Sequence, residues 1–154
     1  MNKLFYVLLF STISFQTFSQ ELQFESGRQK NDKKPELFHN MSVKSRVSSS
    51  FINDVMSYQL KQQVNIAVGN GLLFKGKVTA ITNDAPGLTT ISIQSSDVKD
   101  MVLSLSRVVM PDQTIMYRGI VISKNHSDML IFEKDPITGE YSWNKKTVSQ
   151  MIAD

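Results

Sequence analysis

The 154-residue sequence contains no cysteine, one tryptophan and two histidines. Without cysteine the chain forms no disulfide, offers no thiolate nucleophile and lacks the lipid-accepting residue of a bacterial lipoprotein. His39 lies in a basic segment and His126 in a predicted turn, so no metal-ligand spacing is recognisable. Glycine-rich phosphate loops and nucleophile motifs are also missing. We therefore expect a non-enzymatic protein with no cofactor and no metal.

Long hydrophobic runs are scarce, and the longest lies at the N-terminus, over Leu4–Phe10. It is shorter than the roughly 20 residues that span a bilayer, and it follows the positive charge of Lys3, as in a secretory signal peptide. Small side chains at Thr17 and Ser19 suit signal peptidase, so we expect residues 1–19 to be removed by cleavage near Ser19. The mature chain would have no membrane anchor. The missing disulfides favour a bacterial periplasmic or secreted protein.

Charge is concentrated in one stretch. The chain has 17 basic and 14 acidic residues, and removing residues 1–19 with Lys3 leaves 16 against 14, a formal charge of +2. Residues 28–46 hold much of the basic excess, namely Arg28, Lys30, Lys33, Lys34, Lys44 and Arg46 against Asp32 and Glu36. Since no apolar period runs through it, we interpret residues 20–47 as a basic flexible linker. An exported protein rarely meets nucleic acid, so no nucleic-acid partner is predicted.

Residues 48–154 have the length of one compact β domain. Apolar and polar residues alternate in segments that are typical of half-buried strands, and turn signals such as Gly69-Asn70-Gly71 separate them. Seven strands are predicted, over residues 58–68, 72–81, 88–94, 101–109, 114–122, 129–133 and 141–144. Short strands at this spacing favour a mostly β fold, an antiparallel meander that forms a small barrel or a sandwich.

Two short helices are predicted to flank these strands. Ser49 or Ser50 can cap a helical turn that begins near Phe51, and Asn144 can cap a C-terminal helix over residues 145–152. Three apolar residues share one face of the second helix, namely Val148, Met151 and Ile152.

A five-residue pattern of aromatic, basic, glycine, any residue and valine occurs twice, at residues 74–78 and 117–121. Each copy follows an alternating strand and precedes a turn and a β-rich run, so we expect two related three-stranded units. Glycine in mid-strand marks a bulge or bend, and the aromatic two residues earlier can cover its backbone. The functional alternative is that Phe74, Lys75, Tyr117 and Arg118 line two related partner sites.

Tyr141 and Trp143 occupy alternate positions of the last predicted strand and therefore share a face. We interpret them as core residues. If exposed, they would form a stacking platform for sugar rings or an anchor for a protein. The candidate partner-binding residues are thus Phe74, Lys75, Tyr117, Arg118, Tyr141 and Trp143.

The string His126-Ser127-Asp128 contains the residue types of a catalytic triad. Neighbours in a tight turn point in different directions, whereas a triad is assembled in space, so we assign it no catalytic role. Carboxylate pairs such as Glu133 with Asp135 lie at predicted loop ends. There they are solvated like other surface carboxylates, so we do not expect them to act as acid and base. No catalytic residue is predicted.

The segments Met-Tyr-Arg-Gly-Ile-Val from Met116, Ser-Asp-Met-Leu-Ile-Phe from Ser127 and Gly-Glu-Tyr-Ser-Trp from Gly139 follow one another. This order resembles the β-rich prodomain of reprolysin-type secreted zinc metallopeptidases, which keeps the protease latent and helps it fold. The sequence departs from that family because it has no cysteine to cap a catalytic zinc and no His-Glu-x-x-His motif. The resemblance implies a stand-alone inhibitor or folding partner of a secreted peptidase.

We therefore expect an exported β domain that binds a protein partner. The alternative is a glycan or surface-polymer binding module that uses Tyr117, Tyr141 and Trp143, which full burial of Trp143 would exclude. A small hydrolase would require carboxylates that converge in a cleft.

Overall fold

The structure is a computed structural model that describes residues 34–48, 50–69 and 71–147. The predicted signal peptide, the first part of the predicted linker and residues 148–152 of the predicted C-terminal helix lie outside the described residues.

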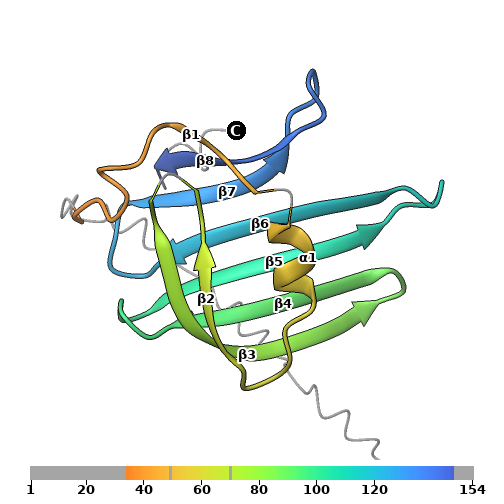
Figure 1. The fold of residues 1–154 in the computed structure, drawn as a ribbon, viewed down its shortest axis with the longest axis horizontal. Coiled ribbons are helices and arrows are strands. Elements are labelled where there is room, and N and C mark those ends of the chain that lie inside the picture. Colours follow the sequence, from red (N-terminus) through yellow and green to blue (C-terminus); the bar gives the residue numbers. More distant parts are fainter. Residues whose placement is uncertain (1–33, 49, 70, 148–154) are drawn as a thin grey trace, which may run out of the picture. The chain divides into compact units, whose positions relative to one another are not determined.

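One antiparallel sheet of eight strands and one short helix make up the described part of the chain. From β2 to β8 each strand pairs with the next along the chain, and β1 pairs with β8 at the far edge, so the order is β1-β8-β7-β6-β5-β4-β3-β2 (Figure 1). The elements are β1 (Lys44–Arg46), α1 (Phe51–Met56), β2 (Gln63–Ala67), β3 (Leu73–Ala85), β4 (Leu88–Ser95), β5 (Met101–Val109), β6 (Ile115–Ser123), β7 (Asp128–Lys134) and β8 (Tyr141–Thr147).

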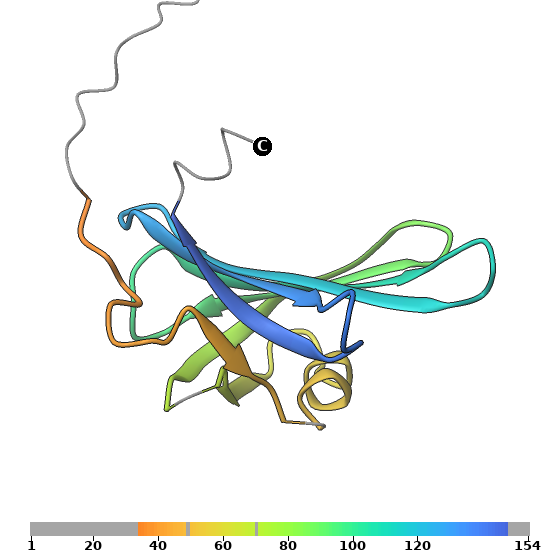
Figure 2. The same cartoon turned by 90° about the horizontal axis from the view of Figure 1, so that it is seen from above.

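The sheet curls into a half-barrel with α1 in its concave side (Figure 2). β3 makes this bend possible, because its pairing with β4 shifts register at two places, and such irregularities increase local twist. The two outer edges approach each other beside Gly69, where an added Cβ would lie 3.0 Å from the carbonyl oxygen of Arg46 in β1. No ladder joins β1 to β2 in the described sheet. The predicted barrel or sandwich is thus corrected to one open, curled sheet.

The hydrophobic core fills the concave side. Leu105, Gly119, Phe132 and Trp143 lie opposite one another on successive strands. From α1, the ring centroid of Phe51 lies 5.4 Å from that of Phe132 and 5.8 Å from that of Trp143. Fully burying a side chain of this size contributes about 1.5–3 kcal/mol, so packing holds the six-residue helix in place. The buried core comprises Phe38, Phe51, Val55, Val64, Ile66, Val68, Phe74, Val78, Ile91, Ile93, Met101, Leu103, Leu105, Val121, Leu130, Phe132 and Trp143.

A buried carboxylate fastens the N-terminal segment to the sheet. The side chain of Asp128 is 0% exposed and accepts hydrogen bonds from the backbone N–H groups of Leu37 and Phe38, at 2.7 and 2.8 Å. Next to it, the backbone N–H of Ser127 donates to the carbonyl of Pro35. Phe38 enters the core at 2% exposure as a result.

Ion pairing and strand pairing extend this attachment. The Lys145 ammonium lies 2.8 Å from Glu36 and 3.8 Å from Asp128, and the Lys145 backbone N–H donates to the carbonyl of Val43. β1 then pairs with β8. The prediction of a flexible linker is therefore wrong for residues 34–47, because the partners that order this segment lie about 90 to 110 residues away in sequence.

The strand predictions agree with the structure most closely where alternation is uninterrupted. Residues 101–109 form β5 as predicted, and α1 begins at Phe51, although Ser50 makes no side-chain capping bond. The predicted strand over 58–68 begins only at Gln63. Residues before it form a turn, in which Lys61 has a φ of 70° and its N–H donates to the carbonyl of Val78.

The start of the predicted C-terminal helix is also corrected. Lys145–Thr147 belong to β8, and Asn144 is a strand residue opposite Ile131, not a helix cap. The reason is that β7 begins at Asp128, so its ladder supplies hydrogen-bond partners for β8 as far as Thr147.

The two copies of the repeated pattern occupy β3 and β6, each with the aromatic on the interior side. At Gly76 an added Cβ would lie 2.9 Å from the Phe74 ring, so the aromatic covers the glycine as expected. At Gly119 the covering groups come from neighbouring strands instead, with Leu105 and Phe132 each 3.1 Å from an added Cβ. The glycines serve close packing in both places.

We expect Asp128→Asn to lower the free energy of unfolding by about 2–3 kcal/mol, because an amide offers one acceptor oxygen where two buried N–H groups need partners. Urea denaturation measures the loss. Hydrogen exchange at Phe38 should accelerate as well. Asp97→Asn is the control, since Asp97 is an exposed carboxylate. Equal stability of the two variants would contradict a fastening role for Asp128.

Candidate functional site

β6 and β7 pair along only part of their length. Their ladder covers Gly119–Ile122 on β6 and Met129–Phe132 on β7. Beyond it β6 stays paired with β5, β7 stays paired with β8, and the two hairpin tips diverge (Figure 1). A groove of about 910 Å³ opens at this split. We call it the β6–β7 groove. Its lining consists of Ser104, Ser106 and residues 116–120 and 131–139.

Aromatic rings support the groove from the interior side of the sheet. The ring of Tyr141 stacks on Phe132, with centroids 5.1 Å apart and an interplanar angle of 13°, and meets Tyr117 edge-on at 5.9 Å. Its hydroxyl oxygen accepts a hydrogen bond from the backbone N–H of Tyr117 at 3.0 Å. Tyr141 thus crosses from β8 to β6 and satisfies a donor that the β6–β7 ladder leaves unpaired.

The charges around the groove differ in how far they are compensated. Arg118 and Lys134 are exposed and form no ion pair within the described ranges. The carboxylates, by contrast, are engaged. Glu133 accepts a hydrogen bond from the Asn144 amide at 3.0 Å, and Asp135 pairs with the Lys44 ammonium at 2.5 Å.

Asp135 shapes the loop that closes one end of the groove. Its carboxylate also accepts the backbone N–H groups of Ile137 and Thr138, at 2.9 and 3.1 Å. The hydrogen bond from Lys44, followed by these two backbone donors, holds the pKa of Asp135 well below its usual range. The ionised form therefore ties the β7–β8 loop to β1.

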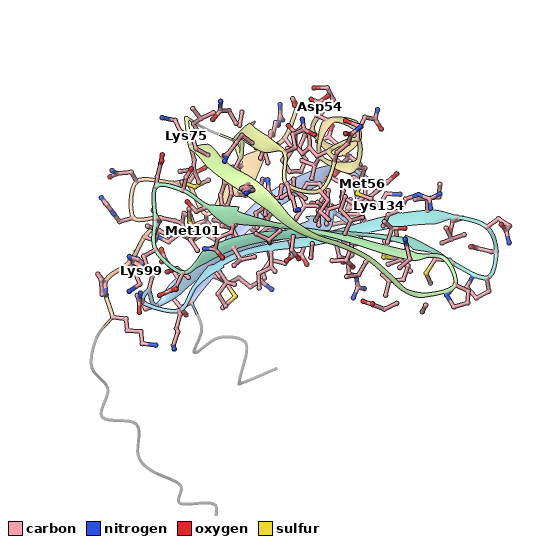
Figure 3. All side chains as sticks on the ribbon, turned by 90° about the horizontal axis from the view of Figure 1, so that it is seen from below. Asp54, Met56, Lys75, Lys99, Met101 and Lys134 are labelled. Carbon is pink, nitrogen blue, oxygen red and sulfur yellow. The ribbon has the colours of Figure 1, made fainter. Side chains whose placement is uncertain are left out.

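Only three of the six candidate residues meet in this groove region, namely Tyr117, Arg118 and Tyr141. Phe74 and Trp143 are core residues at 1% and 0% exposure, so neither can touch a partner in this fold. Lys75 is exposed and lies 3.9 Å from Asp97. It stands on β3, which β4 and β5 separate from β6, and Figure 3 shows it well apart from Lys134.

The burial of Trp143 removes the stacking platform that the glycan hypothesis requires. One face of the Tyr141 ring stacks on Phe132 and is therefore not available to a sugar ring. Of the two related partner sites that the repeat suggests, the first has Phe74 in the core, and the second, with Tyr117 and Arg118, lies in the lining of the β6–β7 groove.

Sequence reasoning missed the serines and Lys134 that line the groove. Ser104 and Ser106 alternate with the buried Leu103 and Leu105, and this alternation is the signal that places them on the outer side of the sheet. Their hydroxyls are bonded to Ser92 and Thr90, at 3.1 and 2.8 Å. Nothing in the local pattern indicates that β6 and β7 separate.

The His-Ser-Asp string forms no triad. The His126 ring nitrogen Nδ1 lies 2.8 Å from the Ser123 hydroxyl, and Asp128 is engaged by backbone N–H groups. In the part of the chain that the structure describes, no three His, Cys, Asp or Glu side chains are grouped to hold a metal ion. Within the same residues, no helix has the length and hydropathy needed to cross a bilayer.

In comparisons with known proteins, no family model, no curated protein and no solved structure matches this chain.

We expect Tyr141→Phe to cost about 1 kcal/mol of stability, because it keeps the ring stacking and removes the hydroxyl that accepts the Tyr117 N–H. Thermal unfolding measures the change. Tyr117→Phe is the matched control, since it deletes a hydroxyl for which no hydrogen bond is seen among the described residues. An equal loss in both variants would mean that the bond from Tyr117 to Tyr141 contributes nothing.

The low pKa of Asp135 predicts a pH-dependent contribution to stability. The unfolded carboxyl titrates near 3.9, so the contribution is complete above about pH 5 and is lost as the pH falls toward the lower pKa of the folded state. Asp135→Asn should therefore lower the melting temperature at pH 7 and have a shrinking effect toward pH 2. Melting curves of Glu140→Gln, in the same loop, provide the control. A difference that is constant with pH would contradict the pairing with Lys44.

Proposed function

We propose that this protein is an exported, non-enzymatic module that binds a partner protein in the β6–β7 groove. The observation that carries the proposal is the groove itself, an open space of about 910 Å³ with Tyr117 and Arg118 in its lining. Compact binding surfaces of this kind combine aromatic and arginine side chains with backbone polar groups.

The filled interior supports a site on the outside of the sheet. In small β-barrels a ligand is held when the lumen is empty. Here Ile93, Leu103 and Leu105 lie in the core at 0% exposure, in one cluster with Phe51 and Val55 of α1. The groove, by contrast, is open to solvent and suits a segment of another chain.

The partner class that we propose is a secreted peptidase. It rests on the resemblance of residues 116–143 to the prodomain of reprolysin-type zinc metallopeptidases, in which the same strands are present in the same order. The groove lies within that stretch, between its first and second strands. A module of this kind would inhibit the peptidase or assist its folding.

Site-specific photo-cross-linking in the native host tests the proposal. A benzophenone amino acid at Arg118 or Thr138, both in the groove lining, should yield an adduct with one exported protein, and the same residue at Lys77 on β3 should not. Adducts only from Lys77 would place binding elsewhere and overturn the proposal.

We expect Arg118→Glu to weaken the binding of the identified partner by about tenfold or more, because it places the opposite charge in the groove. Isothermal titration with the purified partner measures the affinity. Arg107→Glu on β5 is the control of equal charge change, since Arg107 does not line the groove. If the partner is a peptidase, its activity or refolding yield should change with the mature module and not with the Arg118→Glu variant.

A further inference from the structure

The direction of the β6 backbone groups follows from two hydrogen bonds. The N–H of Met110 donates to the carbonyl of Thr114, and the N–H of Tyr117 donates away from β5, to Tyr141. Since strand residues alternate in direction, even-numbered residues of β6 bond to β5 and odd-numbered ones face β7. The ladder to β7 ends at Gly119. The C=O of Tyr117, and the N–H and C=O of Ile115 next to the groove lining, therefore point to the β7 side of β6 without a partner strand.

The opposite wall of the groove, which β7 forms, also presents backbone groups that lack a partner strand. The N–H of Asp135 donates to the carbonyl of Glu140 across the β7–β8 hairpin, and Phe132 pairs with Gly119. Lys134 must therefore direct its backbone toward the groove. Both walls thus present main-chain hydrogen-bonding groups, which is the requirement for adding a strand to a sheet.

The uncompensated positive charge of the groove indicates which kind of segment can bind there. Arg118 and Lys134 are the groove cations without an ion pair in the described chain, whereas Glu133 and Asp135 are already engaged. An arginine at a rim binds carboxylates with paired hydrogen bonds. A segment with an acidic side chain at its centre would compensate the excess positive charge of the groove.

We propose, building on the function above, that the groove accepts an extended, acidic segment of the partner as an added strand along Ile115–Arg118 of β6. Its backbone pairs with the N–H and C=O of Ile115 and with the C=O of Tyr117, and its carboxylate pairs with Arg118. Extended segments rich in threonine and valine suit this mode, because such residues favour strands.

A synthetic peptide tests the mode of binding. The probe is a fluorescein-labelled Ser-Thr-Val-Thr-Glu-Val-Thr-Val-Ser, titrated with mature protein (residues 20–154) in an anisotropy assay. We expect binding in the micromolar to millimolar range and about a fivefold loss when the glutamate becomes glutamine or when backbone nitrogens on one face are methylated. Equal affinity of the methylated peptide, or no binding at millimolar protein, would overturn strand addition.

Protein variants locate the edge. Ile115→Pro removes an N–H that points to the β7 side of β6 and should weaken peptide binding about fivefold, while Ile115→Ala keeps the N–H and should bind nearly as the native protein does. Asn65→Pro is the matched control, because it removes an outward N–H from the free edge of β2. Arg118→Gln should match the loss seen with the glutamine peptide, and Arg107→Gln should not. Loss in Asn65→Pro instead of Ile115→Pro would assign binding to β2 and contradict the proposal.

The experiments distinguish a failure of the strand-addition proposal from a failure of the proposed function. If the cross-linked partner persists at Arg118 but methylation and Ile115→Pro have no effect, the groove binds protein through side chains and only strand addition is wrong. If sedimentation shows a dimer that Ile115→Pro dissociates, a second copy occupies the edge, which overturns the acidic-segment proposal. Absence of any groove cross-link removes the proposed function itself.

Discussion

The architecture depends on one buried carboxylate. Asp128 begins β7 and takes two backbone N–H groups of residues 37 and 38 out of solvent. If these hydrogen bonds were lost while the segment stayed in place, the two donors and the carboxylate would lack these partners, at a cost of several kcal/mol. With the hydrogen bonds formed, Phe38 caps the core, β1 covers the outer edge of β8, and Lys44 reaches Asp135. The same contacts hold the β7–β8 hairpin at its angle, and that hairpin is one wall of the groove.

The groove forms because β6 and β7 each pair more extensively with their other neighbour than with one another. β6 follows β5 along its whole length because the two share an uninterrupted ladder from Met101 to Val109, whereas β7 follows β8, which β1 and Asp135 hold in place. The half-barrel must therefore split between β6 and β7. Tyr141 stabilises the split from inside, because its ring packs on Phe132 and its hydroxyl accepts the first N–H beyond the ladder. The unpaired backbone is limited to a few residues.

Local pattern in the sequence predicts much of this sheet and little of the split. Alternation predicts β2 through β8 because burial of one face has the period of a strand, as in Met101–Val109. It cannot predict β1, a three-residue strand with Lys44 and Arg46 exposed, because pairing with a distant partner and not hydropathy makes it a strand. The repeated pattern identifies Tyr117 and Arg118 as candidates. It does not identify Lys134, because the position of Lys134 in the groove depends on where β6 and β7 separate.

Free strand edges are a liability, because they can pair with any exposed strand. The edge of β6 is limited in three ways: it is short, Tyr141 occupies one of its donors, and Arg118 and Lys134 bring positive charge to its two walls. Two copies of this edge would bring like charges together, which disfavours self-pairing. An acidic strand meets no such repulsion. The positive charge that disfavours pairing between copies would thus also favour the acidic segment that we propose as the occupant.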